Sequence, residues 1–200
     1  MTRSADARRR AELLEAIVDY VFEHGLSDLS LRPLADAVGA SPRVLLYYFG
    51  PSKSDLIQAI IAGVRDRQLR GFAAIRESPF GSPREACLAV WTIMTQPALG
   101  PLFRFFFELF GLALVDRSTY AAFLDHAIED WLAFFSEPLI AGGVSRDEAR
   151  ARATIVLAGF RGFLMDLCAT GDRERIDRAV AMWLDLIMPA PETKEFRHAQ

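Results

Sequence analysis

Apolar residues recur three and four positions apart along most of the chain, which is the spacing of one face of a helix. Leu13, Ile17, Tyr20 and Val21 form one such series, and the same spacing returns between residues 56 and 64. β-Branched residues are scattered, and no stretch alternates strictly between apolar and polar over a useful length. The pattern therefore predicts an all-α fold without strands.

Residues typical of helix ends divide this pattern into segments. Gly39 follows one apolar series, Ser41-Pro42 opens the next as an N-cap with proline at the first helical position, and Ser52 with Asp55 has the spacing of a capping box. Further N-caps are predicted at Ser30, Ser82, Ser145 and Asp172. The predicted helices, about nine in all, cover residues 5–24, 31–38, 42–48, 53–77, 83–96, 101–114, 118–140, 146–170 and 173–188.

The segment from Ser30 to Phe49 has the form of a helix-turn-helix, two short helices joined by a tight turn. Ala35 is small enough for the two helix axes to approach closely, and Leu34 and Leu45 supply apolar contacts between them. A helical corner inside an ordinary all-α domain would show the same pattern, so this reading stays open as an alternative.

In a helix-turn-helix, the second helix presents its polar positions to the DNA major groove. Arg43 is suited to guanine or phosphate, the tyrosine hydroxyls to phosphate oxygens, and Lys53 to the DNA backbone near the start of the following helix. The predicted DNA-binding residues are Arg32, Ser41, Pro42, Arg43, Tyr47, Tyr48 and Lys53.

Residues 8–60 resemble the DNA-binding domain of the TetR (tetracycline-repressor) family of bacterial transcriptional regulators. The matching features are Ser30-Leu31-Arg32, Leu34-Ala35, Val38-Gly39, Ser41, Leu45, Tyr48-Phe49 and Lys53-Ser54-Asp55-Leu56. The resemblance implies a homodimer that binds a near-palindromic operator in double-stranded DNA and responds to a small effector held in the C-terminal region. It predicts a regulator, more often a repressor, with a DNA-binding domain at 1–52, an effector-binding and dimerisation domain at 53–188 and a polar tail at 189–200.

Aromatic residues are concentrated after residue 90. The run from Leu102 to Leu114 alone contains five phenylalanines, interrupted by only two charged residues, Arg104 and Glu108. Core packing explains many of these residues, whereas a cavity for an apolar or aromatic effector would explain some. The predicted effector-binding residues are Trp91, Met94, Thr95, Phe107, Phe110, Trp131, Phe135 and Phe163.

The last two predicted helices combine small residues with apolar stripes. Such stripes either face the chain's own core or, as the resemblance implies, pair with their copies in a second subunit. The predicted dimer-interface residues are Ala158, Gly162, Val180, Trp183, Leu184 and Ile187.

Composition and charge refine this picture. The chain has 200 residues, 52% of them hydrophobic, and a formal charge of −3. That charge excludes a uniformly basic nucleic-acid binder. Residues 1–70 nevertheless carry 10 Lys and Arg against 9 Asp and Glu, so the acidic excess lies after residue 70. Specific DNA binding through a few contacts remains compatible with this balance.

The chemistry of catalysis is poorly represented. No glycine-rich phosphate loop, Gly-x-Ser-x-Gly motif or paired thiols appear. His126 shares a helical face with Glu129 and Asp130, which could bind a metal, but no second Glu-x-x-His appears, so we favour a polar surface or pocket role for His126. We therefore expect neither an enzyme nor a cofactor or metal, although a helical ligand-binding protein or enzyme without a DNA role is the alternative. Two separate cysteines suit a reducing cytoplasm, and the apolar run Leu102–Val115 is expected to be too short to span a membrane.

Overall fold

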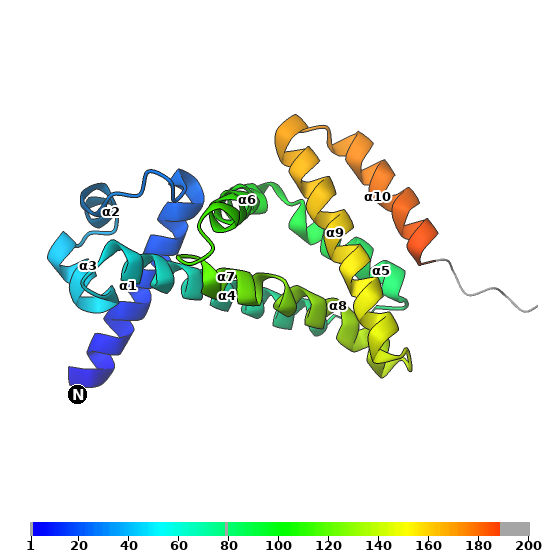
Figure 1. The fold of residues 1–200 in the computed structure, drawn as a ribbon, viewed down its shortest axis with the longest axis horizontal. Helices are drawn as coiled ribbons and strands as arrows, with labels where there is room; N and C mark the ends of the chain where they lie inside the picture. The colour runs from blue at the N-terminus through cyan, green and yellow to red at the C-terminus, as the bar shows by residue number, and fades with distance from the viewer. Residues whose placement is uncertain (1, 79, 189–200) are drawn as a thin grey trace, which may run out of the picture.

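The computed structural model describes residues 2–78 and 80–188, with side chains from residue 5 except residue 79, and every regular element within them is helical. The molecule is elongated, with α1 to α3 at one end and α9 and α10 at the other (Figure 1). The elements are α1 (Thr2–His24), α2 (Leu31–Ala37), α3 (Pro42–Phe49), α4 (Lys53–Arg76), α5 (Pro83–Met94), the 3₁₀ helix η1 (Pro97–Leu99), α6 (Gly100–Val115), α7 (Ala121–Ala127), α8 (Glu129–Ala141), α9 (Arg146–Thr170) and α10 (Arg173–Ile187). The predicted all-α class is confirmed.

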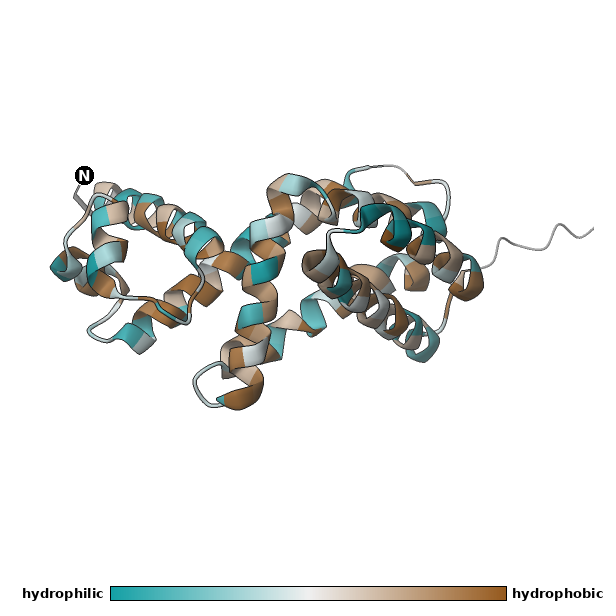
Figure 2. Ribbon diagram, turned by 90° about the horizontal axis from the view of Figure 1, so that it is seen from above, coloured by the Kyte–Doolittle hydropathy of each residue, from teal (hydrophilic) through white to brown (hydrophobic). Residues whose placement is uncertain are grey.

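The helix-turn-helix is formed by α2 and α3, with α1 packed across them. Leu34, Ala35 and Leu45 are fully buried at their meeting point, as their small or apolar side chains predicted. The turn passes through Gly39, whose φ of +64° is a conformation that side chains with a Cβ rarely adopt. Most helices carry hydrophobic and hydrophilic residues in turn along their length, the amphipathic pattern read from the sequence (Figure 2).

The hydrophobic core at the helix-turn-helix end of the molecule extends beyond the first four helices. The cluster that contains Leu34 and Leu45 also includes Phe105 and Leu109 of α6 and Phe123 of α7. A second cluster joins α5, α8, α9 and α10 with one residue each from α4 and α6, and its members include two tryptophans and several phenylalanines. The long helix α4 contributes to both clusters, so it links the two ends of the molecule mechanically.

Every predicted N-cap except Ser30 accepts a capping hydrogen bond. Ser52 and Asp55 make a complete capping box. Ser30 occupies the N-cap position of α2, but its side chain makes no capping hydrogen bond. Ser82 accepts a hydrogen bond from the amide of Glu85, whereas the Glu85 carboxylate turns back to the amide of Gly81 instead of completing a box.

One predicted helix, 118–140, is observed as two, α7 and α8. The division falls at Ile128, which ends one helix and precedes the other. It separates two halves that bury different surfaces: Phe123 and Ala127 join the cluster around the helix-turn-helix, whereas Trp131 and Leu132 join the second cluster. Periodicity alone predicted one helix because both halves are apolar at helical spacing.

Two segments, Pro97–Val115 and Arg146–Thr170, are long and apolar enough to cross a membrane by length and composition. The first of them is longer than the run Leu102–Val115 considered in the sequence, because the turn of η1 continues into α6. Core helices of soluble proteins pass the same test, so this finding is weak support for a membrane location.

Candidate DNA-binding face and effector pocket

α3 and its N-cap residue contain five of the seven predicted DNA-binding residues. Arg43 and Tyr47 are exposed, with 73% of Tyr47 accessible to solvent. Ser41 caps the helix by accepting a hydrogen bond from the amide of Val44 at 3.3 Å, and Pro42 occupies the first turn. The face therefore combines one guanidinium and one phenol on a short helix whose start is fixed by its own cap.

Tyr48 has a different environment from its neighbour. Its hydroxyl donates to Oδ1 of Asp6 at 2.7 Å, and this bond raises the pKa of the phenol above its usual range. Its carbonyl oxygen accepts a hydrogen bond from Nε of Arg10 at 3.2 Å, while the same guanidinium lies 5.2 Å from the centre of the Phe49 ring. Tyr48 thus ties α3 to α1, and its predicted contact with phosphate requires an exchange of its hydrogen-bond partner.

Arg32 and Lys53 stand in the first turns of α2 and α4 and are exposed. Neither they nor Arg43 take part in the ion pairs formed among residues 2–78 and 80–188. The three cations therefore keep their charges available to a polyanion, which is the electrostatic requirement for contact with DNA phosphates.

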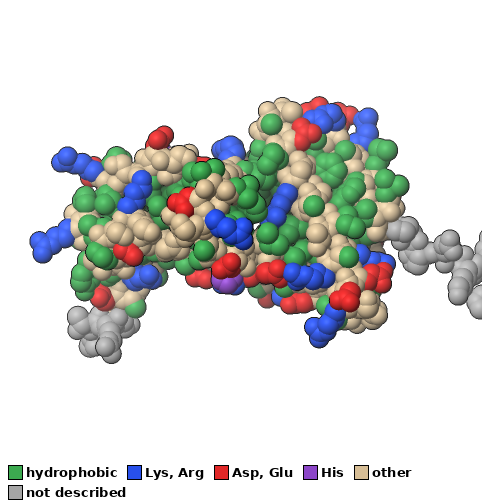
Figure 3. Space-filling view, viewed as in Figure 1, with side chains coloured by type: hydrophobic (Ala, Val, Ile, Leu, Met, Phe, Trp, Pro, Cys, Tyr) green, Lys and Arg blue, Asp and Glu red, His purple; other side chains and the backbone are tan. Residues whose placement is uncertain are grey.

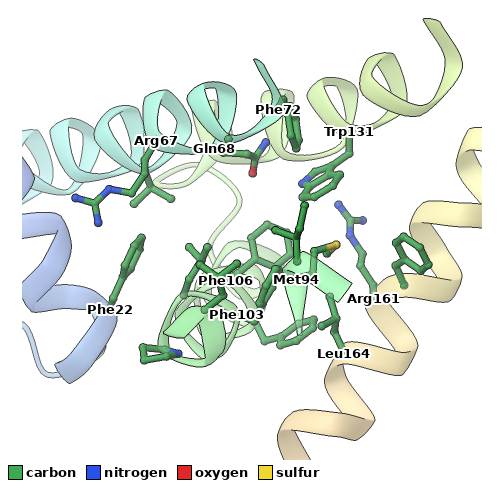
Figure 4. Close-up of a pocket in the computed structure, with 18 of the residues that line it drawn as sticks. Phe22, Arg67, Gln68, Phe72, Met94, Phe103, Phe106, Trp131, Arg161 and Leu164 are labelled. Carbon is green, nitrogen blue, oxygen red and sulfur yellow. The ribbon is translucent and has the colours of Figure 1, made fainter. Parts of the chain in front are cut away.

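A pocket of about 630 Å³ lies between the two ends of the molecule (Figure 4). α1, α4, α6, α8 and α9 contribute to its wall, together with the end of α5 and the η1 turn. Most of the wall is apolar and aromatic, and the polar side chains that line it include Arg67, Gln68 and Arg161. Such a composition is typical of a site that binds a small organic molecule and orients it with a few polar groups.

The structure brings four of the eight predicted effector-binding residues to this pocket: Met94, Phe107, Trp131 and Phe135. The other four do not line it. Trp91 donates from Nε1 to Asp177 at 2.7 Å, so it joins α5 to α10. The Thr95 hydroxyl accepts a hydrogen bond from Arg173 at 3.0 Å.

The remaining two are occupied by aromatic packing. Phe163 packs between Trp91 and Trp183, with ring centres 6.2 and 5.5 Å away. Phe110 packs against Phe106 and Phe123. Aromatic content alone does not separate residues of the wall from residues of the core, which is why the sequence selected both kinds.

Several lining residues were missed. Phe22, Arg67 and Gln68 come from α1 and α4, and no local pattern signals that these helices meet the bundle. Arg161 carried a signal that was not used: a charged residue stands between Phe160 and Gly162 in an otherwise apolar stretch of α9. A charge in such a position is expected to serve a specific partner.

The outer face of α9 and α10 is apolar and uncovered in the single chain. Ala158 and Gly162 are exposed on α9, next to Ile155 and Met165, of which 48% and 55% are accessible. On α10, Met182 and Leu186 are 64% and 81% accessible. Apolar side chains gather over this part of the surface in Figure 3. We call these six residues the α9–α10 face.

The other predicted interface residues lie deeper. Val180 and Leu184 are fully buried within the chain's own second cluster. Trp183 and Ile187 are partly buried, and the Trp183 ring packs directly over Gly159. The interface role of all four residues stays a prediction.

These features define a class before any comparison is made: a helix-turn-helix protein with a ligand-sized pocket in an attached helical bundle. Residues 13–60 match the family model described as bacterial regulatory proteins of the tetR family. This segment is therefore similar to the DNA-binding domain of the TetR family, in agreement with the resemblance in the sequence. The proteins that this family model describes are DNA-binding transcriptional regulators rather than enzymes.

Solved structures share the fold over nearly the whole chain. A transcriptional regulator from Rhodococcus sp. Rha1 superposes with a TM-score of 0.73 at 20% identity, covering 89% of this chain and 95% of the other. A TetR transcription regulator from Haloarcula marismortui gives 0.69 at 20% identity, with 89% and 96% covered. A TetR transcriptional regulator from Legionella pneumophila gives 0.64 at 20% identity, with 88% and 94% covered. A comparison with curated protein sequences finds no match.

Proposed function

We propose that this protein is a homodimeric, ligand-responsive transcriptional regulator that acts as a cytoplasmic repressor. The proposal rests on two features that α4 connects. The exposed face of α3 carries Arg43, and α4 starts beside this face and continues into the wall of a pocket of about 630 Å³. We divide the chain into a DNA-binding domain at 1–52 and an effector-binding and dimerisation domain at 53–188. The predicted tail, 189–200, lies outside the described residues.

DNA recognition is assigned to the α3 face. Arg43 and Tyr47 enter the major groove from the exposed side of α3, while Arg32 and Lys53 neutralise phosphates on either side. Ser41, Pro42 and Tyr48 complete the predicted set. Two such faces related by a two-fold axis read a near-palindromic operator.

Dimerisation is assigned to the α9–α10 face. Its exposed aliphatic and thioether side chains lie beside Ala158 and Gly162, which permit the close approach of a second helix. Burial of apolar surface of this kind is the main driving force for stable association. Two copies of α9 and α10 then form the interface.

Release from DNA is assigned to an apolar or aromatic effector in the pocket. The pocket wall includes Phe22 of α1, Val64 of α4 and Phe106 of α6, so one bound molecule touches helices that pack around the DNA-binding end. An effector lowers DNA affinity only if it binds one arrangement of these helices better than another.

The test is binding of the purified protein to the intergenic DNA beside its own gene. We expect retardation in a gel at low salt, with an affinity that falls steeply as salt rises. Arg43→Ala should weaken binding about tenfold or more, and the matched control Arg146→Ala, at the start of α9, should leave it unchanged. Failure of a folded dimer to retard any such DNA would contradict the proposal.

The alternative is a helical ligand-binding protein or enzyme without a DNA role. It predicts that substitutions between residues 31 and 53 have no functional effect. The family match over residues 13–60 supports the DNA-binding class instead. Groups of His, Cys, Asp and Glu able to hold a metal are not found among the residues that the structure describes.

A further inference from the structure

Arg161 places a guanidinium inside the wall of the apolar pocket. It extends from α9 toward the space that Gln68 approaches from α4 (Figure 4). Its Nη2 donates to the carbonyl oxygen of Ala127 at 3.0 Å. Its guanidinium carbon lies 4.8 Å from the centre of the Phe110 ring and 5.7 Å from that of Phe106. The surroundings are therefore two aromatic faces and one neutral oxygen.

The charge of Arg161 has no counterpart among the described residues. Its Nε is buried and has no hydrogen-bond partner there, and none of the ion pairs in the described chain includes it. The other arginine in the wall, Arg67, is paired with Glu15 and Asp19. A buried cation without a partner is costly. Burial lowers the pKa of Arg161 to about 10, so the side chain still carries its charge at neutral pH.

An acid three residues after Ala127 is already paired with another arginine. Asp130, at the start of α8, accepts hydrogen bonds from Nε and Nη2 of Arg65 at 2.6 and 3.0 Å. This bidentate pair satisfies both carboxylate oxygens, so Asp130 has little capacity left to neutralise a second arginine. The two acids in the pocket wall, Asp19 and Glu23, form no ion pair with Arg161, and Asp19 is already paired with Arg67, so none of the described residues neutralises the Arg161 charge.

We propose that the pocket takes an amphipathic organic anion, an aromatic or aliphatic body that ends in a carboxylate paired with Arg161. The proposal rests on the proposed effector function and names its ligand class. A planar guanidinium binds a carboxylate in a two-point geometry that a neutral polar group does not reproduce. The Gln68 side chain makes none of the side-chain hydrogen bonds found among the described residues, so its amide is available to the same head group.

The size and lining of the pocket agree with this class. About 630 Å³ accommodates a molecule well beyond the head group itself. Phe103, Phe106, Phe107 and Trp131 provide flat apolar surface for the body of the ligand. The aromatic wall then supplies affinity, and the single unpaired cation supplies selectivity for charge.

The experiment uses two molecules of nearly equal shape that differ in charge. The neutral fluorophore N-phenyl-1-naphthylamine first reports occupancy of the pocket in the wild-type protein, and Gly71→Leu, at a lining position with open space around it, should reduce its binding. The dye is then displaced with 1-naphthaleneacetate or 1-naphthaleneacetamide. We expect the acid to compete about tenfold better than the amide.

Arg161→Gln should abolish the preference for the acid over the amide. Its affinity for the neutral dye should stay within about threefold of the wild-type value, because the substitution removes only the charge. Arg161→Lys should retain part of the preference for the acid. Arg152 is an exposed arginine of the same helix, so Arg152→Gln should retain the full preference. Equal competition by acid and amide in the wild type would overturn the proposal without any variant, even though the pocket binds the dye. Absence of dye binding to the wild type would instead contradict the effector pocket itself.

Discussion

Glu108 of α6 binds the loop that joins α1 to α2 through Ser27. The Ser27 hydroxyl donates to Oε1 of Glu108 at 2.5 Å, and the Ser27 amide donates to the same oxygen at 2.7 Å. The Leu26 amide adds a third bond at 3.0 Å. One carboxylate therefore anchors the loop that leads into the helix-turn-helix, and it directly follows Phe106 and Phe107 of the pocket wall in α6.

The first prediction concerns this carboxylate. Glu108→Gln should destabilise the protein by about 1–2 kcal/mol, because an amide oxygen accepts these bonds without the charge that strengthens them. In a chain of this size, that loss corresponds to a fall in Tm of about 2–8 °C. Thermal unfolding followed by circular dichroism measures it.

Ser27→Ala provides the graded comparison. It removes one of the hydrogen bonds at Glu108 and keeps both backbone amides, so its Tm should lie between those of Glu108→Gln and the wild type. An unchanged Tm in Glu108→Gln would show that the carboxylate contributes nothing to holding the loop.

The second prediction concerns the pH dependence of the Tyr48–Asp6 hydrogen bond. The bond to the Asp6 carboxylate raises the phenol pKa in the folded state. The stabilisation is therefore complete below the ordinary tyrosine pKa near 10 and is lost as pH rises through the higher folded value. Difference absorbance near 295 nm, wild type minus Tyr48→Phe, isolates this titration.

Asp6→Asn is the matched variant for that titration. Removing the negative charge should shift the Tyr48 transition to lower pH, because the anionic phenolate no longer faces a carboxylate. A transition at the same pH in both proteins would mean that the two groups do not interact in solution. The same variant frees the Tyr48 hydroxyl for a phosphate oxygen, so its DNA affinity reports whether the bond to Asp6 competes with DNA.

Features that depend on residues close together in the sequence were predictable, whereas features that depend on contacts between distant segments were not. The helix-turn-helix was predictable because its signals are local: Gly39 ends one helix, Ser41-Pro42 starts the next, and Leu34 and Leu45 face each other across a short turn. The prediction of a single helix at 118–140 was wrong, because the chain breaks at Ile128. The residues before and after this break pack into two separate hydrophobic clusters, and the periodicity of the sequence does not show this division.

The pocket was only half predictable for the same reason. Met94 and Trp131 were selected for their size, and so was Trp91, which instead bonds to Asp177. Only the packing of distant helices decides which large side chain fills the core and which faces a space. Arg161 shows the reverse case, since its isolation in an apolar stretch was visible in the sequence and its lack of a partner was not.

The third prediction compares two glycines one turn apart on α9. A Cβ at Gly159 would lie 2.3 Å from the Trp183 ring, whereas a Cβ at Gly162 meets nothing within 4 Å. Gly159→Ala should therefore cost about 1–3 kcal/mol through overpacking. Gly162→Ala should leave the fold as stable or raise its stability by up to about 1 kcal/mol through helix propensity. Urea unfolding measures the free energy of unfolding of both variants, at a protein concentration where their oligomeric state is the same. Equal changes in both variants would show that the Trp183 ring does not pack against Gly159.

The last prediction tests the α9–α10 face. Ala158 is exposed on α9, so Ala158→Arg adds a long charged side chain that the single chain tolerates but that a closely packed second copy does not. Light scattering after size-exclusion chromatography should show a dimer for the wild type and a monomer for the variant, with unchanged helicity by circular dichroism. Ala133→Arg places the same change at an exposed position of α8 and should remain dimeric. A dimeric Ala158→Arg would place the subunit contact elsewhere. A wild-type protein that is monomeric at micromolar concentration would contradict the dimer itself.

Loss of the dimer should also weaken operator binding far more than Arg43→Ala does, because one α3 face then binds without its partner.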